Sequence, residues 1–276
     1  MPVFGLGTWL MGGTKIRNTL NDDKKDIETI QNAVSMGITH IDTAENYAEG
    51  HTETLVGQAL KGYDRKKLFI VTKVDTDHLG YDDVLRACEN SLKRLQMTHV
   101  DLYLIHQPSG TIPLAETMSA MDKLVQEGLA RHIGVSNFTT ERLRQAQSLT
   151  QNKLVVNQVY YNLVAREPEK EGLLQYCQEN DVFLEAYRPL EKGMLLAQPP
   201  AIFQKLATKY GKSPAQIALN WLISQNNVIT ISKTSTIEHL RENLGAVGWQ
   251  MEQEDIEYLL KHFPNQIDKS EMLPLR

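Results

Sequence analysis

Short apolar, β-branched segments recur along the whole chain, and stretches with helical spacing lie between them. There are eight such segments: VFGLGT, ITHID, LFIVTK, VDLYLIH, HIGVS, LVVNQV, VFLEAY and NVITIS. A sustained alternation of strand and helix requires parallel strands joined by right-handed crossovers. The alternation therefore predicts an α/β fold, a (β/α)8 TIM barrel, with an open doubly wound sheet as the competing fold. A longer insertion after VFLEAY holds two helical stretches, and Ser213 is the expected N-cap of the second.

Length and composition are consistent with a single domain over residues 1–276. Of the 276 residues, 41% are hydrophobic and 23% charged, and no Pro/Ser-rich linker interrupts the alternation. The net charge of -5 argues against nucleic acid or an anionic membrane surface as a partner.

The chain carries no sign of export or of membrane insertion. No stretch approaches the roughly 20 apolar residues of a membrane helix, and MPVFGLGTW lacks the features of a signal peptide. Cys88 and Cys177 fall in predicted helices, with no second cysteine nearby to complete a metal or redox pair. These features predict buried thiols and a cytoplasmic protein.

Four ionisable residues of different kinds stand at or near the ends of neighbouring predicted strands. Asp42 and Tyr47 lie in HIDTAENY, Lys73 ends LFIVTK, and His106 ends VDLYLIH. Barrel enzymes build their sites at the C-terminal ends of the strands, so these side chains should meet. An ammonium lowers the pKa of a nearby phenol from its usual value of about 10. We therefore predict Tyr47 as general acid, Lys73 as the group that tunes it, Asp42 as the partner of Lys73, and His106 as a donor to a substrate carbonyl.

Each of these residues also has a structural interpretation when it is taken alone. A buried Asp–Lys pair often only stabilises a fold, and a histidine at a strand end is often a core residue. The prediction therefore depends on all four residues together. No metal site is predicted, because no HxH or HExxH spacing occurs and the other histidines are scattered.

Protonation of an alkoxide is half of a carbonyl reduction, and the other half needs a hydride that no side chain supplies. The hypothesis therefore requires a nicotinamide cofactor. GLGTWL does not complete a G-x-G-x-x-G fingerprint, because Leu10 stands at the third glycine. Lys233 follows the eighth strand, with hydroxyls at Thr234, Ser235 and Thr236 where a helix begins. Barrels bind anions at such a place, although a solvated N-cap beside a surface lysine is the alternative interpretation.

A series of segments occurs in one order along the chain: GLGTW, DTAENY, VTK, LYLIH, GVSNF, VNQV, AYRPL and KTSTIEHLRENL. In these segments the chain resembles the aldo-keto reductase superfamily. The resemblance implies a barrel, binding of NADP(H), with NAD(H) as the alternative, and reversible reduction of aldehydes or ketones to alcohols. It implies that Asp42, Tyr47, Lys73 and His106 are the catalytic tetrad. It also implies that Trp9 lines the substrate pocket together with Tyr47 and His106.

The same resemblance implies a set of cofactor contacts. Ser136, Asn137 and Gln158 match the residues that hydrogen-bond the nicotinamide carboxamide, and Tyr187 matches the aromatic residue on which the nicotinamide ring stacks. The other implied contacts, which include the 2'-phosphate and adenosine end of the site, are Thr8, Asp42, Arg188, Leu190, Lys233, Thr234, Ser235, Thr236, His239, Glu242 and Asn243.

The chain departs from the family pattern at several positions. His239 stands where many members carry an arginine, Arg188 replaces a small polar residue, and Gln107 replaces a tryptophan. The first predicted strand begins almost at Met1, so most of the family's N-terminal hairpin is expected to be absent. The loop after His106 is brief and little chain follows the last helix, which predicts an open and permissive site.

Two other functions are considered beside a carbonyl reductase. A class I aldolase would use Lys73 as its nucleophile, but Asp42 should keep that amine protonated and poorly reactive. A catalytically weak nucleotide-binding sensor or structural barrel protein is the second, and an intact tetrad argues against it. The sequence analysis therefore predicts a monomeric NADP(H)-dependent oxidoreductase that acts on a small carbonyl compound.

Overall fold

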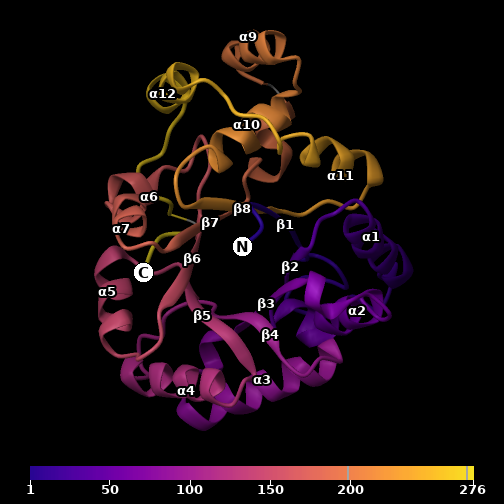
Figure 1. The fold of residues 1–276 in the computed structure, drawn as a ribbon, viewed down its shortest axis with the longest axis vertical. Helices are drawn as coiled ribbons and strands as arrows, with labels where there is room; N and C mark the ends of the chain where they lie inside the picture. Colours follow the sequence, from indigo (N-terminus) through magenta and orange to yellow (C-terminus); the bar gives the residue numbers. More distant parts are fainter. Residues whose placement is uncertain (198, 272) are drawn as a thin grey trace.

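The computed structural model of the protein describes residues 1–197, 199–271 and 273–276. Eight parallel strands form a closed barrel in which neighbours along the chain are neighbours in the sheet, and β8 pairs with β1 (Figure 1). The predicted (β/α)8 barrel is therefore confirmed, and every predicted strand is present. The strands are β1 (Phe4–Gly7), β2 (His40–Asp42), β3 (Phe69–Val74), β4 (Val100–Ile105), β5 (Ala130–Ser136), β6 (Leu154–Tyr160), β7 (Phe183–Tyr187) and β8 (Val228–Ser232).

Helices surround the ring of strands, and α9 and α12 lie at the outer edge of the molecule (Figure 1). Ser213 caps α10 as predicted, in a capping box with Gln216 in which the hydroxyl of Ser213 accepts from the Gln216 backbone N–H at 3.3 Å. The helices are α1 (Asp23–Ser35), α2 (His51–Ala59), α3 (Tyr81–Leu95), α4 (Leu114–Gln126), α5 (Thr140–Ser148), α6 (Glu167–Lys170), α7 (Leu173–Glu179), α8 (Met194–Ala197), α9 (Ala201–Tyr210), α10 (Pro214–Ile223), α11 (Ile237–Leu244) and α12 (Gln253–His262).

The described residues also include four short 3-10 helices, at η1 (Tyr47–Gly50), η2 (Arg65–Lys67), η3 (Thr76–His78) and η4 (Glu191–Gly193). β1 is the first regular element, and none of the described residues before Phe4 belongs to a strand or helix. Both cysteines are buried within helices, Cys88 in α3 and Cys177 in α7, as expected.

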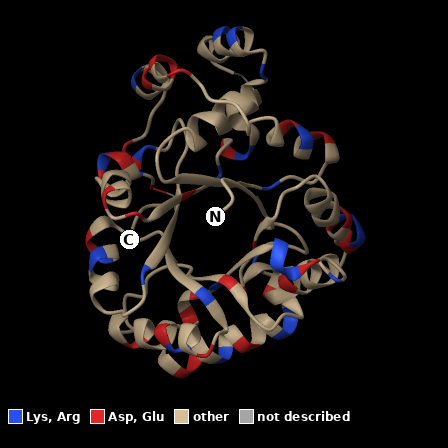
Figure 2. Cartoon of the chain, viewed as in Figure 1, with Lys and Arg blue, Asp and Glu red and all other residues tan. Residues whose placement is uncertain are grey.

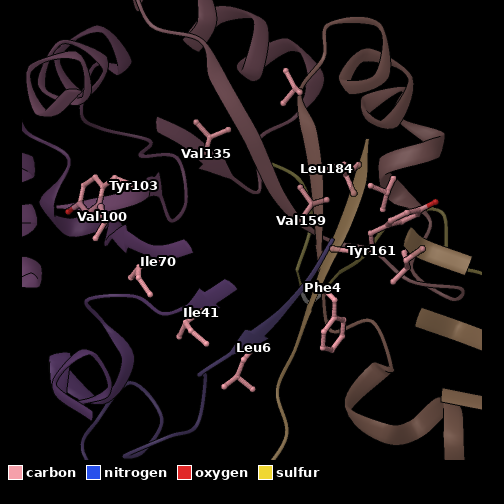
Figure 3. Close-up of a cluster of buried hydrophobic side chains, with 14 of the residues drawn as sticks. Phe4, Leu6, Ile41, Ile70, Val100, Tyr103, Val135, Val159, Tyr161 and Leu184 are labelled. Atoms are coloured by element: carbon pink, nitrogen blue, oxygen red, sulfur yellow. The ribbon is translucent and has the colours of Figure 1, made fainter. Parts of the chain in front are cut away.

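Alternate residues of the strands pack outward against the helices, because side chains on a strand point to opposite faces in turn. Figure 3 shows several of these side chains, among them Leu6, Ile41, Ile70, Tyr103 and Val135, all of which are buried. They belong to the large apolar cluster of the protein. Charged residues lie mainly on the outer helices (Figure 2). None of the described helices has the length and apolar character of a membrane-crossing segment.

The residues between these outward ones point into the barrel. Val71, Leu102, Leu104 and Val156 pack together there and fill part of the interior. Gly134 on β5 leaves room for them, since a Cβ at this position would lie 2.7 Å from the Val156 carbonyl oxygen and 2.8 Å from Leu104 Cδ2. Further along the same strands the inward positions are polar, and these positions form the site described below.

The segment after α12 crosses to the ends of β5 and β6. Glu167 accepts hydrogen bonds from the backbone N–H groups of Ser270 and Leu275 at 3.1 and 3.3 Å. The backbone N–H of Arg276 donates to the Asn137 carbonyl at 2.8 Å. This contact is not evident from the sequence, which shows no motif in the segment.

We expect Gly134→Ala to lower the free energy of unfolding by about 1–3 kcal/mol, because the new methyl group would overpack the interior against a backbone carbonyl. Urea denaturation measures the change. Gly110→Ala is the control, since a Cβ there meets no atom within 4 Å. Equal stability of the two variants would contradict this view of the packing.

Candidate active site

The four ionisable residues predicted from the sequence meet at one end of the barrel interior. Asp42 is the last residue of β2, Lys73 lies near the end of β3, Tyr47 opens η1, and His106 directly follows β4. The ammonium of Lys73 donates to Asp42 Oδ1 at 2.7 Å and to the Thr43 carbonyl at 2.8 Å. Both members of this ion pair are buried. The predicted Lys73–Asp42 pair is therefore present.

Tyr47 lies directly against this ion pair and is also buried. Lys73 Nζ lies 5.3 Å from the centre of the Tyr47 ring. The ring makes edge contacts with His106, at 5.7 Å between ring centres, and with Trp9, at 4.8 Å. All five predicted catalytic and substrate-pocket side chains, including Tyr47 itself, thus form one contiguous group.

The loop after β1 holds the backbone that follows Tyr47. Ala48 and Glu49 adopt left-handed backbone conformations, with φ of 50° and 57°. Their N–H groups donate to the Thr14 and Lys15 carbonyls at 2.7 and 2.9 Å. These two hydrogen bonds hold the left-handed backbone in place and fix the direction in which the chain leaves Tyr47.

The pKa of Tyr47 corrects one expectation from the sequence. Burial raises this pKa, and the negative charge of Asp42 raises it further, while the attraction of Lys73 lowers it. The influence of Lys73 has the predicted sign, but burial outweighs it and the net shift is upward. Burial lowers the pKa of Lys73, but the charge of Asp42 and the hydrogen bond to it raise this pKa, and the net shift is upward. At neutral pH the site therefore holds a protonated phenol beside a permanently charged ammonium.

His106 is held as a neutral imidazole. Burial, with the positive charges of Lys73 and Lys15, lowers its pKa to about 3. Its Nδ1 atom is buried and has no hydrogen-bond partner among the described residues. A neutral imidazole has one N–H, so the ring can donate a single hydrogen bond to an oxygen in the site.

Ser136, Asn137 and Tyr187 form one network at the ends of β5 and β7. The Asn137 amide nitrogen donates to Ser136 Oγ at 2.9 Å and to the His106 carbonyl at 3.1 Å. The Tyr187 hydroxyl donates to the Asn137 amide oxygen at 2.8 Å. Tyr187 also stacks on Tyr160, with 6.0 Å between the ring centres and 17° between the planes. The four side chains hold one another in place.

Gln158 on β6 has one amide atom available for further bonding. Its nitrogen donates to Asp42 Oδ2 at 2.8 Å and to Glu185 Oε2 at 2.7 Å. Its oxygen accepts no hydrogen bond within the part of the chain that the structure describes. This acceptor lies in the same interior as Asn137 and Tyr187, so the group fits a ligand with an amide donor, as a nicotinamide carboxamide has.

The residues expected at the adenosine end surround the start of α11. Thr236 caps this helix by accepting from the His239 backbone N–H at 3.3 Å, which confirms the predicted helix start. Lys233 and His239 are exposed, whereas Thr234 and Asn243 are buried. Ser235 and Glu242 are half-buried. An exposed ammonium beside a helix N-terminus suits a phosphate group.

The remaining predicted contacts have structural partners of their own. The Thr8 hydroxyl donates to the Asp42 carbonyl at 2.9 Å. The Arg188 guanidinium lies 5.9 Å from the centre of the Tyr160 ring, and Leu190 packs against the apolar core. Arg188 has a left-handed φ of 54°, so the chain turns sharply directly after Tyr187.

Two polar residues in this interior did not emerge from the sequence as site residues. His40 on β2 and Glu185 on β7 are both fully buried, and His40 Nε2 lies 3.1 Å from Glu185 Oε1. The available signal was the two-residue period of a strand, which places His40 on the same face as Asp42 and Glu185 on the same face as Tyr187.

Comparison with known proteins agrees with this geometry. The aldo/keto reductase family profile matches residues 3–263. The chain belongs to the aldo/keto reductase family. Methylglyoxal reductase YeaE of Escherichia coli is 35% identical over 268 residues, which are 96% of this chain and 92% of YeaE.

Solved structures of this family share the fold. The crystal structure of the thermostable aldo-keto reductase Tm1743 with the inhibitor epalrestat superposes with a TM-score of 0.91, at 46% identity and 94% coverage of each chain. An aldo/keto reductase of Klebsiella pneumoniae, solved with NADP and acetate, has a TM-score of 0.86 at 36% identity. The superposition covers 100% of this chain and 96% of the Klebsiella chain.

We expect His106 to stay neutral from pH 8 down to about pH 4, because its pKa is lowered to about 3. Nitrogen-15 NMR of the histidine rings measures this directly, with His106→Asn identifying the signal. An inflection of the His106 signal near its usual value of about 6.5 would contradict the buried, positively charged surroundings described here.

Proposed function

We propose that the protein is an NADP(H)-dependent oxidoreductase that reduces aldehydes and ketones to alcohols. The observation that carries the proposal is the buried Lys73–Asp42 ion pair placed directly against the Tyr47 ring. A protonated phenol next to a fixed ammonium is suited to giving a proton to an oxygen that gains negative charge. The family supports the same reaction class.

In this mechanism each side chain has a separate task. His106 donates its single N–H to the carbonyl oxygen of the substrate and holds it beside the Tyr47 hydroxyl. A bound nicotinamide would supply the hydride to the carbonyl carbon. Tyr47 then gives its proton to the oxygen, and Lys73 stabilises the phenolate that remains. Asp42 keeps Lys73 charged and in position, and Trp9 forms a wall of the pocket.

We propose that Gln158, Asn137, Ser136 and Tyr187 hold the nicotinamide end of the cofactor, and Lys233 its 2'-phosphate. The relative from Klebsiella pneumoniae was solved with NADP, which supports this choice of cofactor. The other expected contacts are assigned to the same cofactor: Thr8, Asp42, Arg188, Leu190, Thr234, Ser235, Thr236, His239, Glu242 and Asn243.

We further propose small 2-oxoaldehydes as substrates. The support is the similarity to a methylglyoxal reductase along nearly the whole chain. We propose a monomer, because the proposed roles need no residue from a second chain. The two buried thiols support a cytoplasmic protein. Loss of NADPH absorbance with methylglyoxal would separate this function from that of a nucleotide-binding sensor, which would bind NADPH without turnover.

Tyr47→Phe should lower kcat for methylglyoxal reduction by about 10²–10⁴-fold, the usual contribution of a positioned proton donor. NADPH binding should change by less than about 3-fold, since the ring remains and only the hydroxyl is lost. Steady-state kinetics and fluorescence titration measure the two quantities. Tyr63→Phe is the matched control, because it also removes one phenol hydroxyl. That hydroxyl donates to the Gln31 carbonyl on α1 at 3.4 Å and has no proposed role in the reaction. Undiminished turnover by Tyr47→Phe would remove Tyr47 from the mechanism.

Lys233→Met should raise KM for NADPH by about 10- to 100-fold, as expected when a charged hydrogen bond to phosphate is lost. KM for NADH should change little, because NADH lacks the 2'-phosphate. Lys123→Met on α4, where the lysine pairs with Glu127 at 3.1 Å, removes the same charge elsewhere and should affect neither cofactor. An equal loss for both cofactors would argue against a 2'-phosphate contact.

A further inference from the structure

A pair of buried acid–base groups lies in the barrel interior next to the proposed catalytic residues. Glu185 on β7 and His40 on β2 have fully buried side chains. Glu185 Oε1 lies 3.1 Å from His40 Nε2, but the two groups do not meet with hydrogen-bond geometry, and neither atom has a hydrogen-bond partner among the described residues. An unpaired buried polar atom costs far less when its group is neutral than when it is charged, so this contact favours the uncharged form of both groups.

The surrounding charges also favour a neutral Glu185. Lys73 lies in this interior, and its ammonium is already paired with Asp42 at 2.7 Å. A second buried carboxylate would therefore lack a counter-ion. Burial raises the pKa of Glu185 to about 8, together with repulsion from Asp42, and burial lowers the pKa of His40 to about 4. At neutral pH Glu185 is thus a carboxylic acid that lies beside a neutral His40.

The other oxygen of Glu185 faces Gln158. Glu185 Oε2 accepts from the Gln158 amide nitrogen at 2.7 Å, and Asp42 Oδ2 accepts from the same nitrogen at 2.8 Å. Both N–H groups of the amide are therefore used. If the amide were flipped, its oxygen would face two acceptors, so this arrangement fixes the orientation of Gln158. The Gln158 oxygen is then the amide atom left for a ligand.

A glycine on the neighbouring strand leaves space for the His40 side chain inside the barrel. Gly5 on β1 is the neighbour of His40 in the sheet register. A Cβ at Gly5 would lie 2.8 Å from His40 Cγ and 3.0 Å from Ile231 Cγ2. The missing side chain on β1 thus provides the space that the imidazole fills, and the imidazole in turn holds Glu185 against Gln158.

We propose that Glu185, held by His40, is a positioning residue that orients the Gln158 amide so that its oxygen accepts a hydrogen bond from the carboxamide of the bound nicotinamide. This inference rests on the proposed function, because it assumes that the barrel binds a nicotinamide cofactor. Glu185 acts only through Gln158 and touches neither substrate nor cofactor. The carboxyl group serves here as a fixed acceptor for the Gln158 amide, and it transfers no proton during the reaction.

The test compares equilibrium binding of NADPH with binding of its reduced 3-acetylpyridine analogue, whose acetyl group has no N–H to donate. Glu185→Met removes the acceptor and keeps the length of the side chain. It should weaken NADPH binding by about 3- to 10-fold, the effect of one lost hydrogen bond, and leave binding of the analogue unchanged. Glu185→Gln keeps the length of the side chain and can accept from Gln158 through its amide oxygen, as the carboxyl group does. It should bind NADPH within about 2-fold of the wild type, since the hydrogen bond from Gln158 is retained.

A double-mutant cycle tests whether Glu185 acts through Gln158. Gln158→Met alone should weaken NADPH binding by a similar factor, and adding Glu185→Met should then cost less than about 2-fold more. If Glu185→Met does not fold, as judged by circular dichroism, Glu185→Asp replaces it. The shorter acid cannot reach His40 and Gln158 together, so the same loss is expected.

Three results would overturn the proposal. These are equal weakening of NADPH and of the analogue, additive losses in the cycle, and unchanged NADPH affinity in a folded Glu185→Met. Failure of the proposed function would look different. A wild-type protein that binds NADPH but reduces no carbonyl compound would refute the reductase activity, and the binding results on Glu185 would still stand.

Discussion

One buried ion pair determines the chemistry of the barrel interior. Lys73 and Asp42 are held at 2.7 Å in the barrel interior, where the Thr43 carbonyl accepts from Lys73 and the Gln158 amide donates to Asp42. A buried pair of this kind is stable only when its hydrogen bonds are complete. Because the ammonium is already neutralised, a further buried charge would be unpaired. Glu185 and Tyr47 accordingly keep their protons, and His106 stays neutral.

The fold could be predicted because the chain repeats its signals. Each strand is a short apolar run, and right-handed crossovers leave few ways to arrange parallel strands. The four predicted catalytic residues could be found for a related reason, since the ends of parallel strands meet at one rim. Asp42 and Lys73 are both inward residues on neighbouring strands, and the closed barrel brings their charged groups into contact.

Other features depend on distances that no sequence pattern gives. The net pKa shift of Tyr47 is a balance between burial and the charge of Lys73, and the structure shows that burial dominates. His40 and Glu185 are isolated polar residues in apolar strands, with no motif that marks them. The two-residue period of a strand places both side chains inside the barrel. Only the closed barrel shows that they touch each other.

The burial of both cysteines has a consequence for the proposed reduction of reactive dicarbonyl compounds. Cys88 and Cys177 are the two thiols of the chain, and burial raises the pKa of each to about 12. Electrophiles add to thiolates rather than to thiols, and these sulfur atoms are neither ionised nor accessible. Under the proposed function, the enzyme would reduce dicarbonyl compounds without forming covalent adducts on its own cysteines.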